Sequence, residues 1–154
     1  MSAAPAASPP IIPRFVHLRL HSEYSITDGI ARLDDVIARA RADGMPALAL
    51  TDLANLFGMV KFYTEARSHG VKPIVGCDVW IADADEGPRG NGGRLLLLVR
   101  NHAGYLRLSE LLPEASLTGR NRDRVELPRA AWPAATTSGR ATGSTRSRRR
   151  ASTP

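Results

Sequence analysis

The sequence predicts an α/β fold with a mainly parallel sheet. Segments typical of strands alternate along the chain with segments typical of helices. Apolar residues make up 43% of the 154 residues, which is enough for the core of one ordinary domain. The single cysteine, Cys77, excludes an intrachain disulfide framework.

Composition divides the chain into three parts. Residues 1–13 are rich in Ala, Pro and Ser and are expected to form a loose N-terminal arm, and residues 14–132 are expected to form the domain. Residues 133–154 contain five arginines, no acidic residue and no large apolar residue, so we expect a disordered tail. Much of the net charge of +6 therefore lies in this tail, which either binds phosphates or is a solvated end without function.

The first strand and the first helix are predicted from local patterns. Phe15 to Leu20 alternates between apolar and polar residues and predicts a strand. Ile30 to Asp43 places its apolar residues on one helical stripe. Thr27 or Asp28 can cap this helix at its start, and Gly44 can end it.

A second strand and helix follow. Ala47 to Leu50 is a short apolar run typical of a buried strand. Residues 56–69 predict a helix that buries Val60, Tyr63 and Ala66 on one side, and Gly70 closes it.

Two further strands and a third helix complete the pattern. Residues 71–81 predict a strand, 83–93 a surface loop, and 94–100 a strand that is buried on both faces. Asn101 can cap a helix over about 103–112 that Pro113 ends or breaks. Residues 114–132 show no clear pattern.

The candidate functional residues follow the strands, because reacting groups gather at the carboxyl ends of the strands in parallel α/β folds. These candidates are His21 with Ser22 and Glu23, Thr51 with Asp52, and Asp78. On a strand, His17, Arg19 and His21 would share one face, and Asp28 follows within a turn. Two histidines on one strand face, followed by a carboxylate, are a common metal-binding arrangement, but Arg19 interrupts it here.

Four segments together resemble a known family. They are FVHLRLHSEYSITDG, GMPALALTDLANLFGMVKFYTEA, GVKPIVGCDVWIA and NHAGYLRLSELL. In order and spacing they are similar to the N-terminal polymerase and histidinol phosphatase (PHP) domain of bacterial DNA polymerase III alpha subunits. The resemblance implies a seven-stranded (β/α) barrel related to the TIM barrel, of which this chain would be about the first half.

The resemblance also implies a metal site that has degenerated. Metal-active members carry H-x-H, T-D-H and G-x-E motifs, where this chain has Arg19 before His21, Leu53 after Asp52, and Asp78 after Cys77. His21, Asp28 and Asp78 occupy ligand positions, whereas Arg19 and Leu53 replace ligands and have no lone pair to donate. A fixed cation at position 19 also repels a divalent ion. We therefore expect no cofactor in this fragment, and no zinc or manganese.

Structural roles compete with these assignments. An ion pair between Arg19 and a carboxylate could replace the metal, since buried charges need partners. His21 could instead be a core histidine held by Asp28 or Ser22, and His17 is expected to pack. Cys77 is expected to act as a small hydrophobe.

The function implied by the resemblance is that of the PHP portion of a DNA-directed DNA polymerase. The full-length polymerase would use magnesium and bind DNA, a proofreading exonuclease subunit and other replicase subunits in the cytoplasm. This fragment would lack the polymerase site and serve as a structural and docking domain. The alternatives are a metal-dependent PHP-type phosphoesterase and a nucleic-acid-binding module that uses the Arg-rich tail. No apolar run is long enough to span a membrane.

Overall fold

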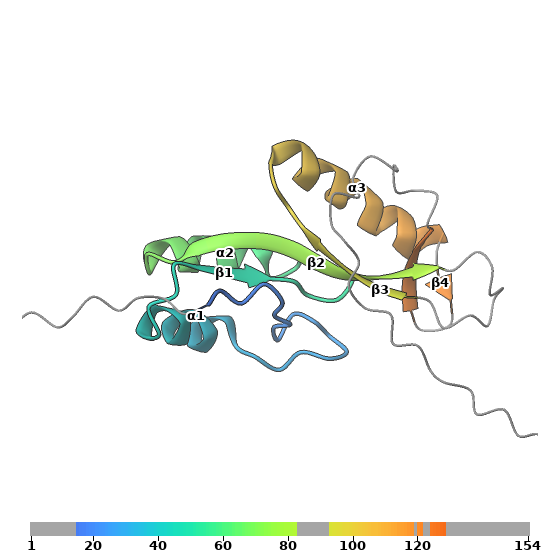
Figure 1. Cartoon of the computed structure of the whole chain (residues 1–154). Helices are drawn as coiled ribbons and strands as arrows, with labels where there is room; N and C mark the ends of the chain where they lie inside the picture. Colours follow the sequence, from blue (N-terminus) through green and yellow to red (C-terminus); the bar gives the residue numbers. More distant parts are fainter. Residues whose placement is uncertain (1–14, 83–92, 119, 122–123, 129–154) are drawn as a thin grey trace, which may run out of the picture.

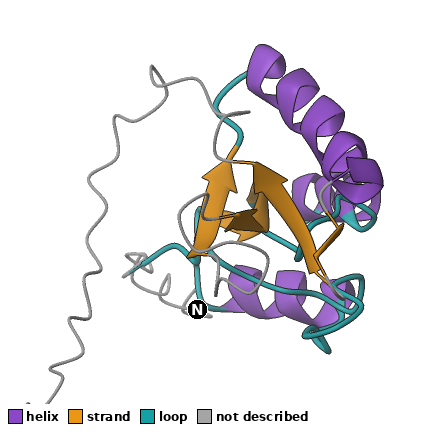
Figure 2. Cartoon of the chain, turned by 90° about the vertical axis from the view of Figure 1, so that its right-hand side faces the viewer, coloured by secondary structure: helices purple, strands orange, loops and turns teal. Residues whose placement is uncertain are grey.

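The computed structural model describes residues 15–82, 93–118, 120–121 and 124–128 (Figure 1). Helices lie beside and below a group of strands (Figure 2). The expected arm over 1–13, the tail over 133–154 and nearly all of the loop over 83–93 lie outside the described residues. In chain order the elements are α1 Leu33–Ala42, β1 Ala47–Leu50, α2 Met59–Ser68, β2 Lys72–Ala82, β3 Gly93–Leu98, α3 His102–Thr118, β4 Arg120–Asn121 and β5 Arg124–Pro128.

The long strand β2 organises the sheet. Its first half pairs with β1 in parallel, from Ala47 opposite Lys72 to Leu50 opposite Val75. Near its end it pairs with β5, also in parallel. These pairings confirm the α/β class and its parallel component.

A strand forms where 94–100 was predicted to form one, but the prediction that it is buried on both faces is wrong. β3 pairs antiparallel with the second half of β2, with Leu98 opposite Gly76 and Gly93 opposite Ile81. The ten residues between Ala82 and Gly93 are too few for a parallel neighbour, which needs a crossover of a dozen or more residues, usually through a helix. Among the described strands β3 pairs only with β2, and its side chains are half-buried or exposed.

The expected strand over Phe15–Leu20 is an extended segment without a regular strand ladder. The amides of Ala49 and Thr51 donate to the carbonyls of His17 and Leu20, both at 2.9 Å. The Leu20 amide donates to the Thr51 hydroxyl at 2.8 Å instead of to a carbonyl. A side chain thus replaces one partner of the ladder, and the segment still lies along β1.

Helix α1 begins three residues later than its pattern predicts. Ala31 forms a bridge with Ser22, which holds the chain extended, and Ile30 is 95% exposed. Arg32 occupies the cap position without a side-chain hydrogen bond, so neither Thr27 nor Asp28 is the cap. Gly44 ends the helix as predicted, with φ of 69° in the left-handed region that favours glycine.

Helix α2 buries Ala66 as predicted, but not Val60 or Tyr63. Phe62 and Ala66 are fully buried, whereas Val60 is 69% exposed and Tyr63 is 42% exposed. Phe62 and Ala66 lie four residues apart and form one stripe toward β1 and β2, which leaves Val60 and Tyr63 on the flank.

Helix α3 runs through Pro113, which was expected to end or break it. Asn101 does cap its start, because the Gly104 amide donates to Asn101 Oδ1 at 2.9 Å. The stripe of Leu108, Leu111, Leu112 and Ala115 stays buried on both sides of the proline. Pro113 itself is exposed, so the carbonyl that loses its amide partner can turn to water.

Two apolar clusters hold the elements together. The first joins α1, β1 and α2, with fully buried Leu33, Ile37 and Phe62 at its centre. The second joins β2, α3 and β5, and contains Cys77, Val79, Leu111 and Leu127. Figure 1 shows α3 on the upper side of β2 and α1 on the lower side of β1.

Candidate functional site

Asp78 is the centre of the candidate site. It lies in the second half of β2, between two residues of the apolar cluster under α3, Cys77 and Val79. Successive side chains of a strand point to opposite faces, so Asp78 lies on the face away from that cluster. Its side chain is only 1% exposed, and burial of an unpaired carboxylate at this depth would be costly.

Two arginines compensate the charge of Asp78. Arg19 donates to Asp78 Oδ2 through Nε at 2.8 Å and also through Nη2. Arg94, in β3, donates to the same oxygen through Nη2 at 2.8 Å. The Arg19 and Arg94 side chains are 53% and 30% exposed, so both guanidinium groups remain partly hydrated. The ion pair between Arg19 and a carboxylate, one of the alternatives from the sequence, is present.

His21 links Asp78 to a second carboxylate. Its Nδ1 lies 2.9 Å from Asp28 Oδ1, and its Nε2 lies 3.1 Å from Asp78 Oδ2. Carboxylate oxygens accept hydrogen bonds, so a ring protonated at both nitrogens would donate to both. His21 therefore lies between the two carboxylates, and Asp28, one of its two expected partners, is confirmed.

Asp28 closes the cluster on the solvent side. It accepts a hydrogen bond from the Ser25 hydroxyl at 2.6 Å, and Arg94 Nη2 lies 3.4 Å from its Oδ2. Desolvation raises the pKa of Asp28, but Ser25, His21 and Arg94 together lower it below its ordinary value. The turn depends on Gly29, where a Cβ would lie 1.9 Å from the carbonyl oxygen of Ser22. We name these five residues, Arg19, His21, Asp28, Asp78 and Arg94, the charge cluster.

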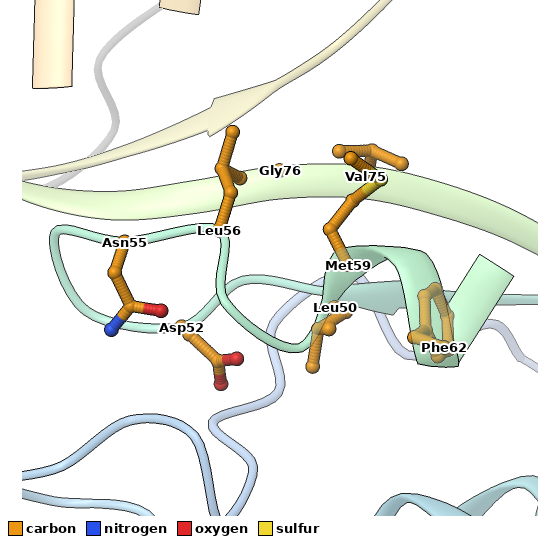
Figure 3. Close-up of a pocket in the computed structure, with 8 residues that line it drawn as sticks. All are labelled: Leu50, Asp52, Asn55, Leu56, Met59, Phe62, Val75 and Gly76. Atoms are coloured by element: carbon orange, nitrogen blue, oxygen red, sulfur yellow. The ribbon is translucent and has the colours of Figure 1, made fainter. Parts of the chain in front are cut away.

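Asp52 does not belong to the charge cluster. It is buried and accepts hydrogen bonds from the Ser22 amide at 2.6 Å and from the Ser22 hydroxyl at 3.0 Å. Burial raises the pKa of Asp52, against the lowering effect of these hydrogen bonds. Asp52 also borders a hollow too narrow for a water molecule, together with Asn55 and apolar side chains from β1, α2 and β2 (Figure 3). Its role is therefore to anchor the segment that follows His21.

Leu53 and Cys77 lie close to Asp78 but take no polar part in the cluster. Leu53 forms an isolated parallel bridge with Asp78, and its amide donates to the Ser25 hydroxyl at 3.0 Å. Burial raises the pKa of the Cys77 thiol to about 12. A thiol that stays protonated is a poor nucleophile, which agrees with the prediction that Cys77 acts as a small hydrophobe.

The structure brings together most, but not all, of the residues singled out from the sequence. Arg19, His21, Asp28 and Asp78 meet in one place, whereas His17 is exposed and packs edge-on against Phe15. Glu23 is exposed. Sequence reasoning missed Arg94, which reaches Asp78 only because β3 folds back on β2. Its position at the start of an aliphatic run was the only signal.

The Trp80 ring also contacts the guanidinium of Arg94. The guanidinium of Arg94 lies 5.2 Å from the centre of the Trp80 ring, and that of Arg124 lies 4.3 Å from it. Trp80 and Arg94 are direct partners in the pairing of β2 with β3. Cation–π contacts thus orient the side chain that compensates Asp78.

The family model described as the PHP domain matches residues 17–138. The chain belongs to the PHP domain family. The resemblance inferred from its motifs is thereby confirmed, and the match extends past the expected boundary at residue 132.

Curated relatives carry the name DNA polymerase III subunit alpha. One, from Neisseria meningitidis serogroup A, is 50% identical over 111 residues, which are 72% of this chain and 9% of the relative. Another, from Pseudomonas fluorescens, is 43% identical over 115 residues, which are 75% of this chain and 10% of the relative. The chain thus corresponds to the PHP portion of such alpha subunits and spans about a tenth of their length.

A solved structure supports the fold. An amidohydrolase from Chromobacterium violaceum, described with bound sulfate and no metal, superposes with a TM-score of 0.51 at 25% identity. The superposition covers 65% of this chain and 32% of the amidohydrolase. This agrees with a partial PHP-type fold.

Within the described residues, no helix combines the length and the apolar character that a membrane span requires.

Proposed function

We propose that this chain is the structural PHP portion of a DNA polymerase III alpha subunit, in which the charge cluster takes the place of a metal centre. One observation carries the proposal. Asp78 Oδ2, at a position where the family places a ligand, accepts from Arg19, His21 and Arg94 at once. Three nitrogen donors around one carboxylate oxygen compensate its buried negative charge, as a bound metal ion would.

The donor set does not suit a divalent ion. Asp78 Oδ2 faces three cationic or potentially cationic groups, and His21 has a carboxylate at each ring nitrogen. Asp78 Oδ1 is buried without a hydrogen-bond partner, but one oxygen is far fewer than the four or more ligands that zinc or manganese takes. We infer that the cluster stabilises the strand ends and performs no chemistry.

The names of the relatives support a role in DNA synthesis for the longer protein of which this chain would be a part. Template-directed DNA synthesis would use magnesium held by carboxylates outside this chain. The PHP portion would stabilise the polymerase and dock other replicase subunits, the proofreading exonuclease subunit among them, in the cytoplasm.

Metal analysis tests the central claim. After dialysis against zinc or manganese and then against metal-free buffer, the purified chain should retain far less than one equivalent of metal. Tightly held, stoichiometric metal, accompanied by manganese-dependent hydrolysis of p-nitrophenyl phosphate, would instead support the phosphoesterase alternative.

A pair of variants makes the test sharper. Arg19→His combined with Leu53→His restores imidazoles at both replaced ligand positions and should raise zinc affinity. Arg19→Gln combined with Leu53→Gln removes the cation without adding imidazoles and serves as the matched control. Equal zinc binding by the two folded double variants would contradict the assignment of these positions.

A further inference from the structure

One flank of α2 is exposed and has no partner helix in the described part of the chain. Val60, Tyr63 and Arg67 are spaced three and four residues apart, so they form one stripe along the helix. Val60 is 69% exposed and Tyr63 is 42% exposed. The flank toward α1 is occupied instead, where Lys61 pairs with Asp34 at 3.2 Å.

The stripe leads into a shallow hollow at the C-terminal end of α2. Tyr63 and Arg67 line it together with Pro46, Gly70, Val71, Lys72 and Pro73, and it has about 400 Å³ of space for water. Val71 is buried and belongs to the first apolar cluster, so the hollow has an apolar floor continuous with the core. We name Val60, Tyr63, Arg67, Lys72 and Pro73 the α2 docking face.

Two cations on this face have no carboxylate partner among the described residues. The Arg67 guanidinium instead makes a weak hydrogen bond of 3.5 Å to the Tyr63 hydroxyl and a cation–π contact of 5.7 Å with the Tyr63 ring. Lys72 makes no side-chain hydrogen bond or ion pair with the described residues. The helix C-terminus favours a cation at Arg67, but it does not explain Lys72, which lies in β2.

We propose that the α2 docking face binds an acidic amphipathic helix of a partner protein. Apolar side chains of that helix would cover Val60 and Tyr63, and its carboxylates would pair with Arg67 and Lys72. This inference rests on the docking role proposed above and gives that role a surface and a partner chemistry. An exposed aromatic residue beside an arginine is also typical of protein interfaces.

Fluorescence anisotropy with a defined probe tests the proposal. The probe is a fluorescein-labelled amphipathic helical peptide of leucine and glutamate, titrated with the full chain. Arg67→Glu with Lys72→Glu should weaken its binding about tenfold or more, since each changed rim charge turns attraction into repulsion. Arg67→Gln with Lys72→Gln should weaken peptide binding less. This milder pair replaces the first in the test if the first does not fold.

Matched controls separate a specific surface from general charge attraction. Arg32→Glu with Arg41→Glu changes the net charge equally at exposed arginines of the α1 region and should leave binding within about twofold. Val60→Gln with Tyr63→Gln should also weaken binding, whereas exposed Thr64→Gln should not. Equal losses from both charge-reversed pairs, or no measurable binding by the folded chain, would overturn the proposal.

Other occupants would give different results. A labelled single-stranded DNA whose binding depends on Arg67 and Lys72, without binding of the acidic peptide, would overturn the proposal in favour of nucleic acid. Concentration-dependent dimers in sedimentation that Val60→Gln abolishes would favour a second copy of this chain. Metal content is a separate readout, so failure of the charge-cluster proposal would leave the peptide result interpretable.

Discussion

The two halves of β2 lie in chemically different surroundings. The first half, Lys72–Val75, pairs with β1 in parallel and borders the apolar cluster of α1, β1 and α2. The second half, from Gly76 onward, has one face in the apolar cluster under α3 and the other in the charge cluster. One strand is therefore held by packing at one end and by packing together with ion pairs at the other.

This difference follows from the period of a strand. Cys77 and Val79 point to one face, so Asp78 between them must point to the opposite face. Because its carboxylate is buried there, it must be compensated, and Arg19, His21 and Arg94 come from two places in the sequence to do so. Charge compensation thus ties the N-terminal segment and β3 to β2.

The largest expected effect compares the two apolar clusters. Phe62→Ala should lower the free energy of unfolding by about 4 kcal/mol, and Leu111→Ala by about 3 kcal/mol, because each removes a fully buried side chain. Urea unfolding of the full chain measures both losses. A loss of less than about 1 kcal/mol for Leu111→Ala would mean that packing under α3 contributes little to the second half of β2.

Asp78→Asn tests the ion pairs alone. Breaking a fully buried ion pair costs about 3–5 kcal/mol, but partly exposed Arg19 and Arg94 can return to water, so we expect about 2 kcal/mol. Asp34→Asn, which breaks an ion pair between two partly exposed side chains, is the control and should cause no measurable loss. Equal results for the two variants would show that the charge cluster does not stabilise the fold.

The caps of α3 and α1, the helices beside the two halves of β2, provide a smaller contrast. Asn101→Ala should cost about 1 kcal/mol, because the Gly104 amide loses its side-chain acceptor. Arg32→Asn should stabilise α1 by up to about 1 kcal/mol, since Arg32 has extended backbone angles but makes no capping hydrogen bond. Thermal unfolding of both variants measures these shifts, and a stabilised Asn101→Ala variant would contradict the cap.

The smallest effect is the acid dependence of the charge cluster. The pKa of Asp28 is lowered from 3.8, so its contribution to stability is complete above that pH and is lost as the pH falls through the lower, folded-state pKa. Asp28→Asn should therefore lose less stability than the natural chain on acidification below pH 3.8. Urea unfolding across this range checks it. Parallel pH profiles would show that His21 and Arg94 do not favour the charged form of Asp28.

Asp52 should respond in the opposite direction. Burial raises its pKa above 3.8, so its ionisation costs stability as the pH rises through the folded-state value. Comparison of Asp28→Asn with Asp52→Asn in the same pH series therefore separates a compensated carboxylate from a desolvated one.

The sequence by itself determined the features that depend on neighbouring residues. These include the buried strand Ala47–Leu50, most of the long strand over 72–82, the end of α1 at Gly44 and the cap at Asn101. Apolar runs, glycine conformation and capping side chains act within a few residues, so a sequence displays them directly. The motifs also placed Arg19, His21, Asp28 and Asp78 at one site, and the ion pair of Arg19 was one of the alternatives.

Only the tertiary structure decided how distant segments meet. In the structure β3 is antiparallel to β2, and α3 continues through Pro113. Val60 and Tyr63 are exposed, and Phe15–Leu20 forms no regular ladder. It also brought Arg94 to Asp78, sixteen positions away in the sequence. Each of these outcomes depends on which strand or helix lies opposite, and pairing between elements outweighs local preference wherever apolar area or a buried charge must be covered.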